Sequence, residues 1–68
     1  MAEGLRNALR AERDRMGWTQ AELAMRVGVS RKTINTVENG VFVPSTVLAL
    51  KLARALGRPV EALFSLSE

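Results

Sequence analysis

The sequence has no cysteine and no histidine, and its aromatic residues are one tryptophan and two phenylalanines among 68 residues. Without cysteine or histidine the chain cannot form a disulfide or a zinc site built on thiolates or imidazoles, so we expect neither a metal nor a cofactor. A chain this short buries only roughly 60% of the surface that it exposes when unfolded. Its stability must therefore come from close helix packing or from a second subunit.

Long hydrophobic runs are also missing. No apolar stretch approaches the roughly 18 residues that a membrane span requires, and no charged-then-apolar leader opens the chain. Ten Lys and Arg against seven Asp and Glu leave a net charge of +3, which permits a polyanionic partner without requiring one. We expect a soluble, cytoplasmic protein that contacts no membrane.

Glycine, serine and proline divide the chain into five short segments, and each has the apolar spacing of a helix. The expected helices cover residues 3–15, 20–27, 31–38, 46–56 and 60–64. In the first of them Leu5, Leu9 and Met16 fall on one side, which predicts its buried face. The apolar stretch 41–43 is the one candidate strand, but a proline follows it and no partner is evident. The sequence therefore predicts one all-α, five-helix domain over residues 1–68.

The helix ends carry capping residues. Thr19 and Glu22 form a capping box at the start of the second helix, and Ser30 is a suitable cap for the third. Gly28 tolerates the left-handed backbone that follows a helix. Pro59 sits where a missing amide hydrogen is harmless, just before the fifth helix. These residues place a tight turn between the second and third helices.

The second and third helices match a helix-turn-helix, which we place at residues 20–39. Such a motif needs apolar residues at set spacings along both helices, a small residue where the helices touch, and a glycine in the turn. The chain provides all of them: Leu23, Val27, Val29, Ile34 and Val37 as the apolar set, Ala24 as the small residue, and Gly28 in the turn. A random pair of amphipathic helices would rarely supply both the small residue and the glycine.

These residues also resemble a known family. The segments 19–24, 28–30 and 38–40, together with Ile34, Pro44, Leu52, Ala53 and Leu56, are similar to the phage-repressor and Cro class of regulators, the Xre family. The resemblance covers about residues 5–64, and the C-terminal part is similar to compact bacterial repressors that consist of this domain and little else. It implies a five-helix lambda-repressor-like fold that binds double-stranded DNA, usually as a dimer on a palindromic operator.

The third helix carries polar residues on the faces that Ile34 and Val37 do not need for the core. Arg and Lys can donate to guanine O6 and N7, Thr can bond a base edge, and Asn can pair with adenine. The resemblance implies that the most direct base contacts come from Arg31, Lys32 and Thr36. Thr33 and Asn35 are further candidates for DNA contact. Thr33 sits at a first-turn site that could serve the backbone, and Asn35 could point to solvent or to phosphate. The alternative is a solvated face that only keeps a small domain soluble.

Phosphate contacts are expected from the ends of these helices, because the first amides of a helix favour an anion. Gln20 is the leading candidate at the start of the second helix. By resemblance, Asn39 and residues 40–43 approach another phosphate, with Ser30 close enough to contribute. The alternatives are an ordinary exposed residue at Gln20 and a helix-ending role for Asn39.

The resemblance also implies an ion pair between Arg13 of the first helix and Glu38 of the third, beneath the DNA-facing surface. Removing one partner of such a pair leaves a charge unmatched, so we expect the pair to orient the loop that touches phosphate. The alternative is two unrelated surface charges. Trp18 is expected in the core or against the second helix, rather than stacked on a base.

The C-terminal residues are more apolar than such a short chain can easily hide, and an exposed apolar patch usually marks a partner surface. We therefore predict a homodimer through the fifth helix and the tail, residues 59–68. Its expected interface residues are Val60, Leu63, Phe64 and Leu66, with Leu56 assisting. The alternative is that Leu63 and Phe64 close the core of one chain. In a dimer, the recognition helices would lie roughly 34 Å apart, one turn of DNA.

Other classes of function are weaker. The chain lacks a glycine-rich phosphate loop and paired carboxylates in an evident cleft, so we predict no enzyme. The five helices use nearly all residues, so no small-molecule effector is expected. The prediction is a transcriptional regulator, in its most specific form a repressor. By resemblance, the rival is an antitoxin or restriction-modification controller that binds DNA and also a partner protein.

Overall fold

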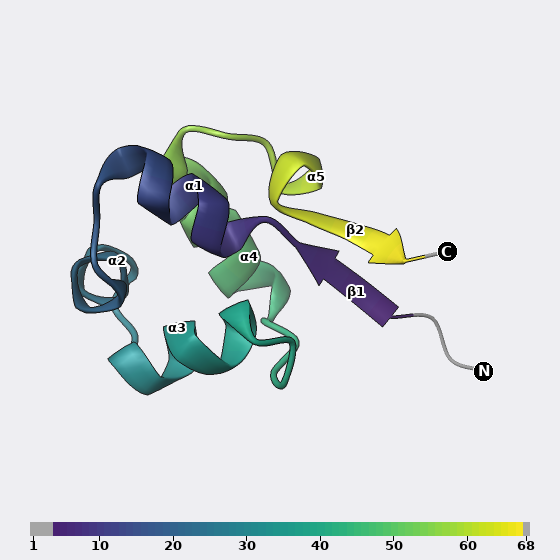
Figure 1. Cartoon of the computed structure of the whole chain (residues 1–68), viewed down its shortest axis with the longest axis horizontal. Coiled ribbons are helices and arrows are strands. Elements are labelled where there is room, and N and C mark those ends of the chain that lie inside the picture. The colour runs from purple at the N-terminus through teal and green to yellow at the C-terminus, as the bar shows by residue number, and fades with distance from the viewer. Residues whose placement is uncertain (1–3, 68) are drawn as a thin grey trace.

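The computed structural model describes residues 4–67, and in them helices surround a core beside a small two-stranded sheet (Figure 1). The elements, in chain order, are β1 (Gly4–Asn7), α1 (Leu9–Met16), α2 (Gln20–Val27), α3 (Arg31–Glu38), α4 (Thr46–Leu56), α5 (Val60–Leu63) and β2 (Phe64–Ser67). The five predicted helices are present in this part of the chain. None of its helices is both long and apolar enough to cross a membrane.

The predicted caps set the helix boundaries. Thr19 Oγ1 accepts a hydrogen bond from the Glu22 amide at 3.0 Å, and the Thr19 amide donates to Glu22 Oε1 at 2.9 Å. Ser30 and Ser45 each accept from an amide of their helix's first turn at 3.1 Å. Gly28 ends α2 with φ +75°, in the left-handed region that residues other than glycine rarely adopt. These local bonds explain why α2, α3 and α4 begin where the sequence predicts.

The core is built from all five helices. Its buried members are Leu9, Leu23, Ala24, Val27, Ile34, Val37, Leu48, Leu52, Ala53, Leu56 and Leu63. Trp18 is half-buried against this cluster, and the Arg26 guanidinium lies over its ring, 4.0 Å from the centroid. Trp18 therefore belongs to the packing of α2, as the sequence predicts.

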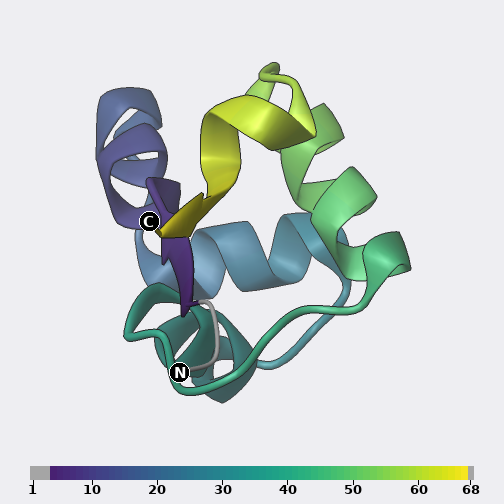
Figure 2. The ribbon, with the colours of Figure 1, turned by 90° about the vertical axis from the view of Figure 1, so that its right-hand side faces the viewer.

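The start of the chain differs from the prediction. Residues 4–7 form β1, not the first turns of a helix, and pair antiparallel with β2 from Gly4 opposite Ser67 to Asn7 opposite Phe64. Leu5 and Met16, predicted to face the core, are exposed, and only Leu9 of α1 is buried. The strands project together beside α5 and away from α2 (Figures 1 and 2). The fold is thus mostly helical, with a short ribbon that the all-α prediction omits.

Asn7 joins this ribbon to the helices. Its side-chain oxygen accepts from the amide of Leu9, the first residue of α1, at 3.3 Å, while its Nδ2 donates to the Val37 carbonyl near the end of α3 at 3.1 Å. The Ala8 amide donates to the Leu63 carbonyl at 2.8 Å. Bonds to residues far along the chain therefore hold residues 4–7 extended and fix the position of Ala8, which a local helical pattern cannot reveal.

A charged cluster links α1 to the segment after α4. Glu12 Oε1 accepts from Arg15 Nε at 2.7 Å and from Arg58 Nε at 3.1 Å, and Arg15 also donates to the Leu56 carbonyl at 2.9 Å. The bonds from Arg15 and then Arg58 lower the pKa of the Glu12 carboxyl below its usual value. The ionised carboxylate is therefore the form that the folded chain favours.

This lowered pKa predicts a pH dependence of stability. Below the unfolded value of about 4.5, the unfolded chain protonates Glu12 first, so its contribution is present above that pH and is lost as pH falls through the folded pKa. Urea unfolding at a series of pH values should show that Glu12→Gln lowers the free energy of unfolding near neutrality, and that the gap to the parent closes in acid. Glu61→Gln is the control, because Glu61 is an exposed residue of α5 that forms no ion pair within residues 4–67. It should lower the free energy of unfolding near neutrality by less than Glu12→Gln does. A gap for Glu12→Gln that widens in acid would contradict the assignment.

Candidate nucleic-acid interface

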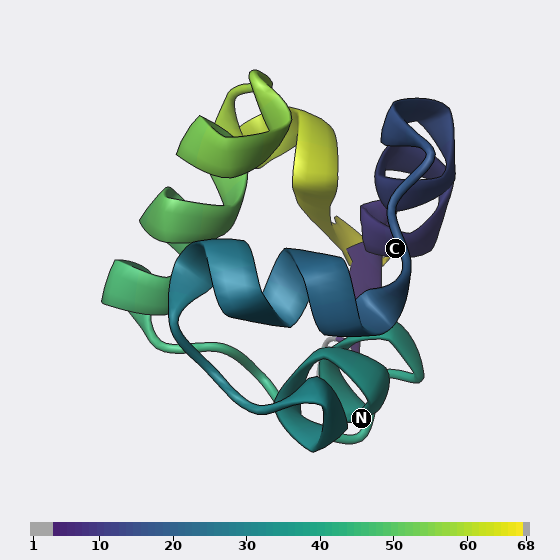
Figure 3. The ribbon, with the colours of Figure 1, turned by 90° about the vertical axis from the view of Figure 1, so that its left-hand side faces the viewer.

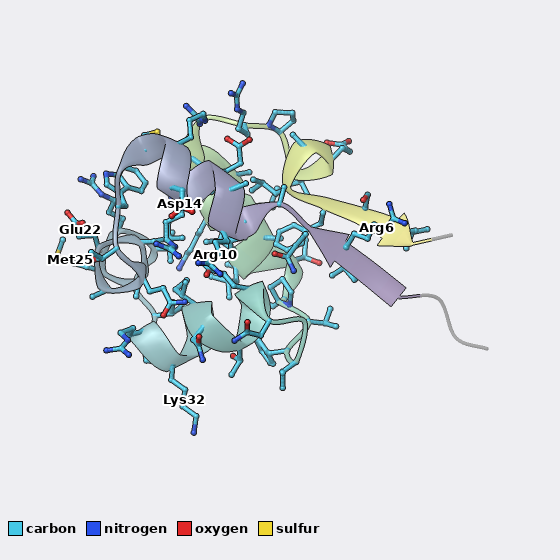
Figure 4. All side chains as sticks on the ribbon, viewed as in Figure 1. Arg6, Arg10, Asp14, Glu22, Met25 and Lys32 are labelled. Carbon is cyan, nitrogen blue, oxygen red and sulfur yellow. The ribbon has the colours of Figure 1, made fainter. Side chains whose placement is uncertain are left out.

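The two faces of α3 have opposite character. Ile34 and Val37 are buried against the rest of the chain, whereas Arg31, Lys32 and Asn35 are exposed. The helix lies at one edge of the molecule in each of the three ribbon views (Figures 1–3). Lys32 points away from the other elements at that edge (Figure 4). The polar side of α3 is therefore open to a large partner.

The second helix holds α3 in this position. The helices α2 and α3 pack directly against each other, and Figure 3 shows α2 running across the front with α3 below it. Leu23, Ala24 and Val27 provide the buried side of α2, and Val29 in the turn is half-buried against the core. The small side chain of Ala24 permits the close approach that the motif requires.

The charge on this surface is positive. The first turn of α3 contains no acidic residue, and within residues 4–67 no ion pair involves Arg31 or Lys32. The one acidic residue of α3, Glu38, is paired with an arginine. An approaching polyanion therefore meets two unopposed cations, a pattern that suits nucleic acid.

The hydroxyl groups of α3 are partly engaged within the helix. Ser30 Oγ and Thr33 Oγ1 share a hydrogen bond of 2.9 Å, and Thr33 is half-buried. Thr36 Oγ1 donates to the carbonyls of Lys32 at 3.1 Å and Thr33 at 3.0 Å. Since its hydrogen is used internally, Thr36 offers an acceptor oxygen and a methyl group to a ligand.

Arg13 and Glu38 form the expected pair. Arg13 Nε lies 2.6 Å from Glu38 Oε2 and its Nη2 lies 3.2 Å from Oε1, while Nη1 donates to the Trp18 carbonyl at 2.8 Å. The side chains are only 11% and 3% exposed. The carboxylate raises the pKa of the Arg13 guanidinium, which is partly offset by burial. The pair joins α1, the α1–α2 turn and the end of α3.

The loop after α3 is anchored to that helix. The amides of Val41 and Phe42 both donate to the Thr36 carbonyl, at 2.9 and 3.2 Å. Asn39 is exposed beside Gly40, whose φ of +73° reverses the chain. The loop's orientation therefore depends on the position of α3.

Gln20 lies differently from a free phosphate ligand. Its side chain is turned toward α3, where Nε2 donates to Glu38 Oε1 at 3.0 Å and to Asn35 Oδ1 at 3.3 Å. A side-chain amide has two hydrogens, and both are used. The expected donation from the Gln20 side chain to phosphate is therefore not available in this conformation. The backbone amide of Gln20 lies in the first turn of α2, where amides have no intrahelical acceptor, and so it can still donate to phosphate.

The predicted dimer residues separate into two groups. Leu56 and Leu63 are buried in the core of one chain, which corrects the expectation that they meet a partner. Val60 and Phe64 are half-buried, and Leu66 is 55% exposed. Leu56 and Leu63 lie in the core because α5 folds back against α4.

A shallow apolar groove of about 260 Å³ lies beside the ribbon. It is lined by Leu5, Val43, Pro44, Thr46, Ala49, Leu50, Val60 and Phe64. Leu66 pairs with Leu5 across the two strands and extends the apolar surface. Sequence reasoning identified Val60, Phe64 and Leu66, but missed the contributions of β1 and α4, which adjoin them only after folding.

A sequence family matches most of the chain. A family described as helix-turn-helix matches residues 9–63. The chain is 49% identical over 65 residues to an uncharacterized HTH-type transcriptional regulator of Methanothermobacter thermautotrophicus, and the match covers 94% of each chain. It is 36% identical over 52 residues to the antitoxin HipB of Escherichia coli, covering 76% of this chain and 55% of HipB.

Solved structures show the same arrangement. The restriction-modification controller protein C.AhdI from Aeromonas hydrophila is similar with a TM-score of 0.75 and 37% identity, over 79% of this chain and 82% of C.AhdI. A putative DNA-binding protein from Bacteroides fragilis has a TM-score of 0.81 over 90% of this chain and 98% of its own. At 23% identity, that second likeness concerns the fold alone.

The Arg13–Glu38 geometry predicts the effect of breaking the pair. Glu38→Gln removes the negative partner of a guanidinium that is nearly buried, and should lower the free energy of unfolding by about 1.5–3 kcal/mol. Urea unfolding measures the change. Asp14→Asn is the matched control, because Asp14 lies 3.6 Å from the same arginine but is 62% exposed, and should cost under about 1 kcal/mol. Equal losses for the two variants would contradict a special role for Glu38.

Proposed function

The chain belongs to the helix-turn-helix family, a family of DNA-binding transcriptional regulators, and from this premise we propose that it binds specific sequences of double-stranded DNA. In the proposal, α3 enters the major groove, and α2 lies across the backbone of the duplex. The observation that carries it is the amphipathic α3: its aliphatic side is buried, and its cationic side is exposed at an edge of the molecule. A duplex is wide enough to contact both α3 and the start of α2.

Base contacts are assigned to three residues of α3. Arg31 and Lys32 donate to acceptors such as guanine O6 and N7, and Thr36 contributes its acceptor oxygen or its methyl group. The exposure of the two cations and the absence of ion pairs to them within residues 4–67 support this assignment. Asn35 adds a contact from the same exposed face.

Phosphate contacts are assigned to the rim of this surface, which is formed by the start of α2, the two ends of α3 and the loop after α3. The backbone amide of Gln20 opens α2, Ser30 and Thr33 lie at the start of α3, and Asn39 lies at its end with the following loop. Neutral donors of this kind position the protein, while the residues facing the groove select the sequence. The Arg13–Glu38 pair supports this rim without contacting DNA.

We also propose that the regulator is a homodimeric repressor acting on a palindromic operator, with residues 1–68 as one domain and residues 59–68 contributing to the interface. The apolar groove between β1, α4 and α5 and the exposed Leu66 support a second copy as the occupant. Val60 and Phe64 line that groove, whereas Leu56 and Leu63 are assigned to the core. Two copies related by a twofold axis would match two half-sites about 34 Å apart.

A second candidate keeps the DNA contact and adds a partner protein. Similarity to the antitoxin HipB and to the controller protein C.AhdI favours a regulator of a toxin or a restriction system. Purification of the chain together with the product of a neighbouring gene would favour this candidate over a free-standing repressor.

Selection of bound sequences from a random DNA pool tests the proposed function directly. On the selected duplex, Arg31→Ala should weaken binding by about 1–3 kcal/mol and relax the preference at one base pair, because a guanidinium donor is lost. Arg6→Ala removes the same charge from β1, away from α3 (Figure 4), and should leave the selected sequence unchanged. An equal loss on every duplex for Arg31→Ala would make it a phosphate contact, and failure to select any sequence would overturn the function.

Sedimentation at micromolar concentration tests the proposed dimer. The parent should sediment as a dimer, and Leu66→Glu should raise the dissociation constant more than tenfold, because a charge replaces an apolar side chain in a buried surface. Met25→Glu is the control, since Met25 is also exposed, at 72%, but lies on α2. A parent that sediments only as a monomer would contradict the dimer.

A further inference from the structure

Three side-chain amides meet where α2 crosses α3. Gln20 comes from the first turn of α2, Asn35 from the middle of α3 and Asn39 from its C-terminal end. Gln20 Nε2 donates to Asn35 Oδ1 at 3.3 Å, and Asn39 Nδ2 donates to the same oxygen at 3.2 Å. The Asn35 carbonyl thus accepts two hydrogen bonds from its own chain.

The Glu38 carboxylate determines the orientation of the Gln20 side chain. Its second hydrogen goes to Glu38 Oε1 at 3.0 Å, and that carboxylate is held by Arg13. An acidic acceptor fixes the NH₂ end of the amide toward α3, because the other end carries an oxygen that the carboxylate would repel. The Arg13–Glu38 pair therefore sets which way Gln20 faces, and Gln20 sets which way Asn35 faces.

With its oxygen occupied, Asn35 presents the remaining NH₂ group to solvent on the exposed face of α3. Resting on the proposed DNA-binding function, we infer that Asn35 binds DNA as a donor only, and that Gln20 is a positioning residue for it. The ligand atom is an acceptor. Both a phosphate oxygen and an acceptor on a base edge, such as guanine O6 or thymine O4, have that chemistry.

This inference changes the prediction for adenine. Bidentate pairing with adenine requires the asparagine oxygen to accept from N6 while its nitrogen donates to N7. The oxygen of Asn35 already accepts from Gln20 and Asn39, and lies on the side of the amide that faces its own chain. Adenine recognition would break both bonds, so the amide cluster selects against it.

A double-mutant cycle tests the positioning role of Gln20. On the duplex selected by the parent, Asn35→Ala should weaken binding roughly five- to tenfold, as expected for one lost hydrogen bond. Gln20→Ala should weaken it roughly two- to threefold in the parent and have no effect when residue 35 is already alanine. Met25→Ala, at an exposed residue of α2, should act independently of Asn35→Ala. Additive losses for Gln20→Ala and Asn35→Ala would overturn the positioning role.

The two sources of the acceptor give different results in the same pool selection. If Asn35 contacts phosphate, Asn35→Ala should weaken the selected and unrelated duplexes equally and leave the selected sequence unchanged. If it contacts a base, the variant should relax a preference for guanine or thymine at one base pair. Either result supports donor-only binding. Relaxation of a preference for adenine would overturn it.

Asn35→Asp separates the two ends of the amide. It keeps an oxygen for Gln20 and Asn39 but replaces the outward NH₂ with a negatively charged oxygen. It should therefore bind every duplex more weakly than Asn35→Ala does. Equal binding by the two variants would show that the outward end of residue 35 does not lie against the duplex, and would overturn the inference.

The amide cluster is also tested without DNA, so that its failure differs from failure of the proposed function. In ¹⁵N-labelled free protein, Asn35→Ala should shift the side-chain NH₂ resonances of Gln20 and Asn39, while Met25→Ala should not. Unchanged resonances together with intact DNA binding would overturn this inference alone. If Asn35→Ala shifts these resonances but the parent binds no duplex, the proposed function and the DNA contact built on it are overturned.

Discussion

The bidentate pair between Arg13 and Glu38 is the interaction on which the candidate surface depends. It joins α1 to the end of α3, and a third bond from the same guanidinium holds the carbonyl of Trp18 ahead of α2. The pair also neutralises the single acidic residue of α3, so that the exposed side of this helix carries only positive charge. One nearly buried ion pair thus orients three helices and sets the electrostatics of their shared surface.

Around this pair, polar groups extend the same connection outward. Glu38 receives Gln20, and Gln20 and Asn39 bond the oxygen of Asn35. A side-chain amide has an oxygen at one end and an NH₂ group at the other. The Glu38 carboxylate therefore determines that the NH₂ end of Gln20 faces α3, and this donor in turn orients the oxygen of Asn35. The polar side of α3 is consequently ordered before any ligand arrives, which reduces the entropy that a ligand must overcome.

The two-stranded ribbon is held to the helices by a different set of contacts. β1 and β2 pair residues 4–7 with residues 64–67, and Asn7 joins the ribbon to α1 and to the end of α3. Packing of α5 against α4 buries Leu63, while Leu66 remains on the surface beside the apolar groove. The fold therefore divides the apolar residues of the C-terminal segment between the core and the surface.

Most of the helices and the outward face of α3 follow from the sequence alone, because their causes are local. Thr19 with Glu22, Ser30, Ser45 and Gly28 determine where helices begin and end through bonds within a few residues. What only the tertiary structure decided depends on residues distant in the chain: the strand at residues 4–7, the burial of Leu63 and the inward turn of Gln20. A helical pattern at residues 3–15 and an exposed glutamine at a helix start are both valid local expectations. The partners that overrule them, β2 and Glu38, come within reach only when the chain has folded.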